Sequence, residues 1–115
     1  MNKGTFYEEK AVEFLKLKGY KILEKNFKTR WGEIDIIAKD RNYITFVEVK
    51  ARQKNYMVSG LEAIDKDKKD KIIKVASFYA SKNLDRFYRF DVLEIIQHKN
   101  CFVYNLIKGA FDSGD

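Results

Sequence analysis

The chain has 115 residues, a formal net charge of +6, a sequence isoelectric point near 9.3 and a hydrophobic fraction of 45%. This size suits one globular domain with a single core, and the lone Cys101 excludes an intrachain disulfide and a cysteine-based metal site. No apolar run approaches the ~18 residues of a membrane span and no apolar segment follows the N-terminus, so we expect no membrane association and a cytoplasmic location. The basic charge favours a polyanionic partner.

Hydrophobic periodicity and turn residues predict seven elements and one connecting loop. They are a helix over residues 5–18, strands over residues 20–28, 33–39 and 43–51, a polar loop over residues 53–60, a helix over residues 61–81, and strands over residues 89–96 and 102–107. The order α-β-β-β-α-β-β predicts an α/β fold with a mixed central sheet flanked by helices. We expect residues 1–108 to form one domain and residues 109–115 to form a short, frayed tail.

Two of the predicted strands carry acids where apolar residues would be expected. Glu33 and Asp35 alternate with isoleucines in the first, and Glu48 and Lys50 alternate with valines in the second. Side chains two residues apart on a strand share a face, and a turn at residues 40–42 would fold the two strands into a hairpin. We therefore expect Asp35, Glu48 and Lys50 to meet. Two carboxylates and an ammonium group are suited to holding Mg²⁺ and stabilising charge in phosphoryl transfer.

Two other interpretations of these charged residues remain open from the pattern alone. The acids and the lysine could form a structural ion pair, or they could lie on an exposed sheet face with alternating charges. The intervening isoleucines and valines indicate strands that are buried on the opposite face. Acids on rigid, well-packed strands are held in position, which favours a functional site.

Two charged residues fall on the apolar stripes of the predicted helices. Glu8 shares a helical face with Ala11, Val12 and Leu15, where an unpaired acid is costly to bury. It is either an N-terminal carboxylate favoured by the helix dipole or a residue at the rim of the site. Lys68 lies in the middle of the stripe of the second helix. It either snorkels to solvent or reaches into the site or to a phosphate.

Further candidates for nucleic-acid contact flank the two acidic strands. Arg30 and Trp31 precede the first strand, where an aromatic ring beside a cation can stack on a base. Such a tryptophan is more often a residue at the edge of the core. Arg52 and Lys54 follow Lys50 and could meet phosphates on the approach to the site, or could be ordinary charged loop residues.

The motifs resemble those of a known group of proteins. Asp35 and, after 12 intervening residues, Glu48-Val49-Lys50 resemble the D…(D/E)-x-K signature of the restriction-endonuclease-like nuclease superfamily. The strings G-E-I-D-I-I-A at residues 32–38 and F-V-E-V-K-A-R at residues 46–52 resemble more closely the YraN-like family of small bacterial proteins. That family is similar to archaeal Holliday-junction resolvases. Other matching positions are Gly4, Glu8, Ala11, Asn26, Lys68 and Arg89-Phe90-Asp91-Val92, so the resemblance extends from Gly4 to Ile107.

The resemblance implies a restriction-endonuclease-like fold and a role for each matching residue. Asp35 and Glu48 would be ligands of Mg²⁺ or Mn²⁺, and Lys50 would be the catalytic lysine. Glu8 would be the acid, carried on a helix, that often completes such sites. A fold does not fix a function, so the residues must support these roles themselves.

These observations predict a Mg²⁺-dependent endonuclease that cuts DNA, with branched or damaged DNA as the expected substrate. The alternatives are a non-catalytic nucleic-acid-binding module with the same fold, and a protein-interaction subunit whose acids form internal ion pairs. We expect a homodimer, because cutting both strands of a duplex or junction symmetrically requires two sites related by a two-fold axis.

Overall fold

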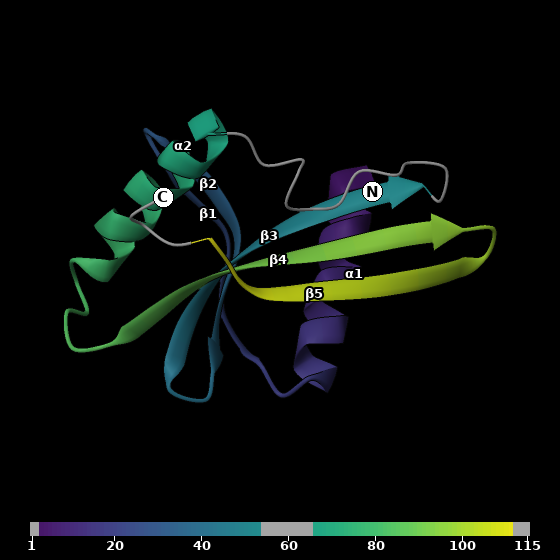
Figure 1. Ribbon diagram of the computed structural model, residues 1–115, viewed down its shortest axis with the longest axis horizontal. Coiled ribbons are helices and arrows are strands. Elements are labelled where there is room, and N and C mark those ends of the chain that lie inside the picture. Colours follow the sequence, from purple (N-terminus) through teal and green to yellow (C-terminus); the bar gives the residue numbers. More distant parts are fainter. Residues whose placement is uncertain (1–2, 54–65, 112–115) are drawn as a thin grey trace.

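The computed structural model describes residues 3–53 and 66–111 and forms an α/β fold with one five-stranded mixed sheet and two helices (Figure 1). The elements are α1 (Lys3–Leu17), β1 (Lys21–Thr29), β2 (Gly32–Asp40), β3 (Tyr43–Gln53), α2 (Lys66–Ala80), β4 (Phe87–His98) and β5 (Cys101–Phe111). This confirms the predicted order α-β-β-β-α-β-β. Neither helix in the described part of the chain is long and apolar enough to cross a membrane.

The strands follow one another across the sheet in the order β1-β2-β3-β4-β5. β3 and β4 are parallel, and the other three neighbouring pairs are antiparallel. The predicted hairpin between the acidic strands is confirmed: Asp40 pairs with Tyr43, and Arg41 in the turn has a positive φ of 58°. The parallel pair requires a crossover, and α2 lies within it.

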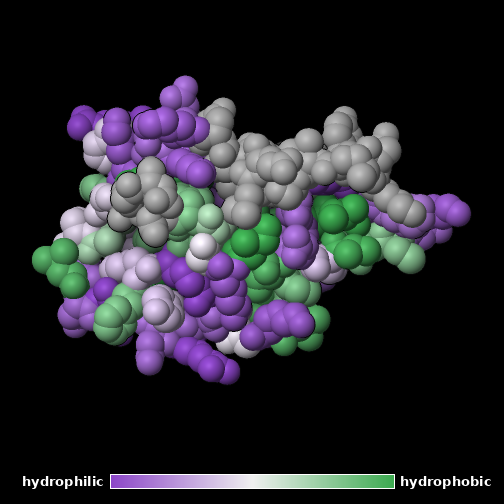
Figure 2. All heavy atoms as spheres, in the orientation of Figure 1, coloured by the Kyte–Doolittle hydropathy of each residue, from purple (hydrophilic) through white to green (hydrophobic). Residues whose placement is uncertain are grey.

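Each face of the sheet packs against one helix. Figure 1 shows α1 behind β3 to β5 and α2 beside the other end of the sheet. The α1-side core consists of Tyr7, Ala11, Leu15, Tyr20, Ile36, Ala38, Val47, Leu93 and Ile95. The α2-side core consists of Ile34, Ile37, Ile44, Phe46, Ile72, Val75, Ala76, Phe90, Val92 and Phe111. Figure 2 shows hydrophilic side chains over the outer side of α2 and a mixture of hydrophobic and hydrophilic side chains along β4 and β5.

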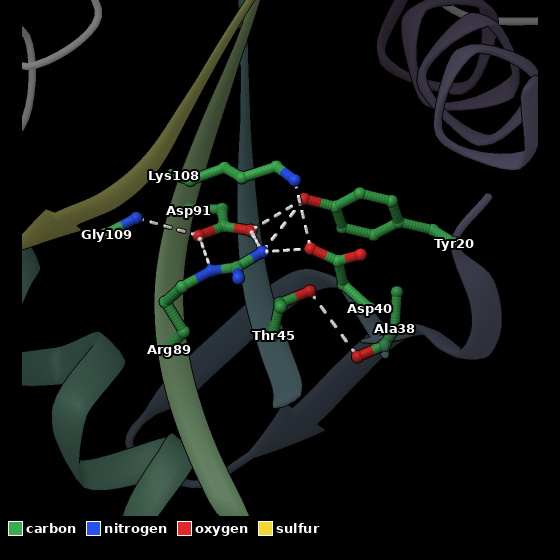
Figure 3. A network of polar contacts seen from close by, with 8 residues as sticks. All are labelled: Tyr20, Ala38, Asp40, Thr45, Arg89, Asp91, Lys108 and Gly109. Atoms are coloured by element: carbon green, nitrogen blue, oxygen red, sulfur yellow. Dashed lines mark hydrogen bonds and ion pairs between the residues drawn. The ribbon is translucent and has the colours of Figure 1, made fainter. Parts of the chain in front are cut away.

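A buried polar network, which we call the Arg89 network, joins four separate segments of the chain (Figure 3). It consists of Tyr20, Asp40, Arg89, Asp91 and Lys108. Arg89 donates from Nε to Asp91 Oδ1 and from Nη2 to Asp40 Oδ2, both at 2.8 Å. Lys108 Nζ donates to Asp40 Oδ2 at 3.1 Å, and the Tyr20 hydroxyl donates to Asp91 Oδ2 at 3.1 Å. Among the described residues, no buried side-chain polar atom lacks a partner.

The Arg89 network also explains why β5 is longer than expected. We predicted a strand that ends at residue 107 and a frayed tail from residue 109, but β5 continues to Phe111. The Gly109 amide donates to Asp91 Oδ1 at 3.0 Å, and Phe111 is buried and stacks on Phe90 with ring centroids 4.7 Å apart. These contacts hold residues 109–111 in the sheet; residues 112–115 lie outside the described part.

The substitution Asp91→Asn should destabilise the protein by about 3 kcal/mol, because it removes one of the two carboxylates that contact the largely buried Arg89 guanidinium. Urea unfolding measures the change. Glu33→Gln is the matched control, since the exposed Glu33–Lys28 pair is separated by 4.0 Å and such pairs contribute less than about 1 kcal/mol. Equal stability of the two variants would contradict a structural role for the Arg89 network.

Candidate active site

The candidate site forms where β2 and β3 separate. Their backbone pairing ends at Ile36 and Val47. Beyond that pair, the side chain of Asp35 takes over as acceptor, because the Val49 amide donates to Asp35 Oδ2 at 2.8 Å. The hydrogen bond satisfies a backbone donor that the ladder leaves unpaired and fixes the position of the carboxylate.

Strict alternation of side chains is interrupted at this point of β2. Ile34 packs in the α2-side core, whereas Ile36 packs in the α1-side core, although the two are two residues apart. Our expectation that Glu33 and Asp35 share a face is therefore not met. Glu33 is exposed beside Lys28, and Asp35 is half-buried near β3.

The carboxyl groups of Asp35 and Glu48 are neighbours and line the same small cavity. Glu48 is 9% exposed and Asp35 is half-buried, so both carboxyl groups are largely shielded from solvent. Burial, followed by the contact with Glu48 and its charge, raises the pKa of Asp35 to about 8, against the opposing effects of the Val49 amide and Lys68. The Asp35 carboxyl group therefore keeps its proton to a higher pH than an ordinary aspartate.

Two lysines complete the cluster. Lys68, on the first turn of α2, places Nζ 3.4 Å from Glu48 Oε2. Burial lowers the pKa of Lys50, and the hydrogen bond and charge of Lys68 lower it further, although the two acids act in the opposite direction. The pKa of Lys68 is raised, because its contacts with Lys50 and the acids outweigh the effect of burial. We call Asp35, Glu48, Lys50 and Lys68 the acid–lysine cluster.

The acid–lysine cluster has a donor set suited to a divalent cation. Two carboxylates in contact need a proton or a cation between them, and oxygen ligands are those that Mg²⁺ prefers. Asp35 and Glu48 therefore fit the metal that the sequence resemblance implies. Within residues 3–53 and 66–111, no group of three His, Cys, Asp or Glu side chains is placed to hold a metal ion.

Glu8 does not join this carboxylate pair. It lies on α1, whose apolar residues pack on the other face of the sheet from α2. Its Oε2 accepts a hydrogen bond at 2.9 Å from Asn26 Nδ2 on β1, where Asn26 has a positive φ of 51°. Glu8 lines an open groove of about 340 Å³ between α1 and β1, together with Lys25 and Asn26.

Arg52, which follows Lys50 and was a candidate for phosphate contact, is paired with an acid on β4. Arg52 Nε donates to Glu94 Oε2 at 3.0 Å, and the side chain of Arg52 is only 12% exposed. Asn105 also donates to Glu94, at 2.9 Å. Sequence reasoning missed Glu94, although an acid within an apolar strand was the signal that identified Glu48. Lys54 lies outside the described residues.

Arg30 and Trp31 lie in the turn between β1 and β2. The Arg30 guanidinium carbon is 4.7 Å from the centroid of the Trp31 ring. Trp31 is half-buried and packs against the α2-side core, which agrees with a position at the edge of the core. Arg30 remains exposed.

Comparison with known proteins identifies the family. The model of the "Uncharacterised protein family UPF0102" matches residues 7–95, which include the whole acid–lysine cluster. A UPF0102 protein of Clostridium botulinum (strain Kyoto / Type A2) is 48% identical over 113 residues, which cover 94% of this chain and 92% of the relative. A UPF0102 protein of Sulfurihydrogenibium sp. (strain YO3AOP1) is 50% identical over 95 residues, covering 81% and 83% of the two chains. The chain therefore belongs to the UPF0102 family, which confirms its resemblance to the YraN-like proteins.

Proposed function

We propose that the protein is a Mg²⁺- or Mn²⁺-dependent endonuclease that hydrolyses phosphodiester bonds in DNA. The observation that carries the proposal is that Asp35, fixed by the Val49 amide, and Glu48 line one cavity, with Lys50 beside them. The net charge of +6 supports a polyanionic substrate. Branched or damaged DNA remains the expected substrate, and a homodimer would supply the second site.

Each member of the acid–lysine cluster has a role in this reaction. Asp35 and Glu48 would hold the metal ion, which supplies charge neutralisation at the phosphate and lowers the pKa of water. Lys50, whose pKa is lowered, is suited to accept a proton from the attacking water. Lys68 lies 3.4 Å from Glu48. If a metal ion neutralised the two acids, the Lys68 ammonium group would be released to contact a phosphate oxygen.

A second candidate function is a non-catalytic DNA-binding module. The ion pair between Lys68 and Glu48 favours it, because this lysine already neutralises one acid without a metal ion. In that case DNA would bind through the basic surface with a strong dependence on salt. No metal-dependent cleavage would accompany that binding.

A cleavage assay on linear, nicked, flapped and four-way DNA with Mg²⁺ and Mn²⁺ tests the proposed function. Asp35→Ala should abolish both metal binding and cleavage. Lys50→Ala keeps both carboxylates, so it should bind metal and DNA but cleave more slowly by a factor on the order of 10²–10⁴. Cleavage of none of these substrates by wild type would support the DNA-binding module instead.

The pH dependence of stability tests the raised pKa of Asp35. The raised pKa of Asp35 means that ionising this group destabilises the fold progressively as the pH rises from about 4 to about 8. In EDTA, Asp35→Asn should therefore melt several degrees above wild type near pH 9, because the introduced amide resembles the protonated acid, and the difference should shrink towards pH 4. Glu33→Gln on the same strand is the control and should follow wild type. A difference that is constant with pH would contradict the assignment.

Lys68 and a metal ion should compete for Glu48. Lys68→Met removes the ammonium group from Glu48 Oε2, so Mg²⁺ binding without DNA should become several-fold tighter. Calorimetry measures the affinity. The neighbouring Lys69 lies 5.6 Å from the Phe111 ring, so Lys69→Met is the matched control and should leave the affinity unchanged. Equal effects of the two substitutions would show that only the overall charge matters.

A further inference from the structure

The turn between β1 and β2 presents a cation stacked on an aromatic ring. Thr29 holds the turn: its Oγ1 accepts a hydrogen bond from the Trp31 amide at 3.1 Å and donates to the Gly32 carbonyl at 3.4 Å. The guanidinium of Arg30 lies over Trp31 at 4.7 Å. Arg30 is exposed and Trp31 is half-buried, so the pair lies at the surface, and we call it the Arg30–Trp31 platform.

The platform is anchored from behind by aromatic packing. The Trp31 and Phe78 rings are 6.0 Å apart, and Phe27 lies 6.5 Å from Phe78 and 5.4 Å from Tyr79. One strand, β1, and α2 thus contribute to the position of the Trp31 ring. A rigid support of this kind lowers the entropy that a ligand would lose on stacking there.

α2 connects the platform to the acid–lysine cluster. A β-carbon placed on Gly32 would lie 3.9 Å from Lys71 Cβ, so α2 passes directly over the base of the turn. Lys68 lies three residues before Lys71, on the same helical face, and contacts Glu48. Along β2, Gly32 and Asp35 are three residues apart, or about 10 Å at the usual rise of a strand. The platform is therefore within one or two nucleotides of the proposed metal ligands.

We propose that the Arg30–Trp31 platform stacks on an unpaired nucleobase of a DNA strand whose backbone passes along Lys71 and Lys68. The inference rests on the proposed function for the location of the cleaved phosphate. A planar guanidinium and an indole ring both stack on the faces of bases. Inside a duplex these faces are covered by neighbouring base pairs, so the platform selects DNA with a single-stranded segment beside the site.

The charges around the platform favour the same ligand. Lys28, Arg30 and Lys71 are exposed cations at this end of β1, β2 and α2. The acid beside them, Glu33, is exposed and lies 4.0 Å from Lys28. Phosphate contacts by these cations supply affinity without regard to sequence, and stacking supplies the preference for unpaired bases.

The fluorescence of Trp31 measures stacking directly, because Trp31 is the only tryptophan in the chain. In EDTA, a short single-stranded oligonucleotide should quench this fluorescence on binding, and a duplex of the same sequence should quench it much less. The single strand should also bind several-fold more tightly at equal salt. Equal quenching and equal affinity for the two forms would overturn the proposal.

Arg30→Lys is the decisive variant, because it keeps the charge and removes the planar group. It should retain the salt-dependent affinity for duplex and lose several-fold of the affinity for the single strand. Lys10→Ala is the control, because Lys10 is a cation beside aromatic rings that lies away from the platform. It is on α1, 4.9 and 4.2 Å from the centroids of the Phe6 and Phe102 rings. A single-strand preference that survives in Arg30→Lys would overturn the stacking role.

The binding assay needs neither metal nor cleavage, so the two proposals fail separately. Stacking without cleavage of any DNA would refute the endonuclease and leave the platform as a single-strand binding site. Cleavage of duplex and single-stranded DNA at equal rates, without quenching, would refute the platform and leave the endonuclease.

Discussion

The hydrogen bond from the Val49 amide to Asp35 is the interaction on which the candidate site depends. It forms where the β2–β3 ladder stops, and it uses a side chain as acceptor in place of a backbone carbonyl. One carboxylate thereby completes the hydrogen bonding of the sheet and lies against Glu48. A site built in this way takes its rigidity from the strands themselves, which is what positioned chemistry requires.

The Arg89 network and the acid–lysine cluster shift the pKa values of their aspartates in opposite directions. In the Arg89 network, Asp40 and Asp91 both contact the same guanidinium, and Asp40 also contacts Lys108. Burial raises the pKa of Asp40, but the hydrogen bonds from Arg89 and Lys108 outweigh it and leave the pKa lowered. In the acid–lysine cluster the pKa of Asp35 is raised instead. The first arrangement stabilises the fold. The second holds a carboxyl group with a strongly raised pKa, which is typical of functional sites.

Local patterns in the sequence predicted the features that depend on neighbouring residues. The order of elements and the turn before Tyr43 followed from periodicity, and Glu48 and Lys50 were correctly placed together with Asp35. The failures involve partners distant in the chain. Arg52 is held by Glu94, 42 residues away, because β3 and β4 pair in parallel. The end of β5 depends on the bond from Gly109 to Asp91, and the interruption of β2 depends on packing against both helices.

The contacts of the acid–lysine cluster and of the Arg89 network close chain segments of very different length. The Asp35–Val49 bond spans 14 residues within one hairpin. Tyr20 and Asp91 are 71 residues apart, and Arg89 and Asp40 are 49 residues apart. Loop-closure entropy rises with the logarithm of this separation, so the hairpin is the easier structure to form. Asp35 and Glu48 are thus brought together by the β2–β3 hairpin, which closes the shortest loop. Lys68 on α2 reaches Glu48 only after the chain has crossed over from β3.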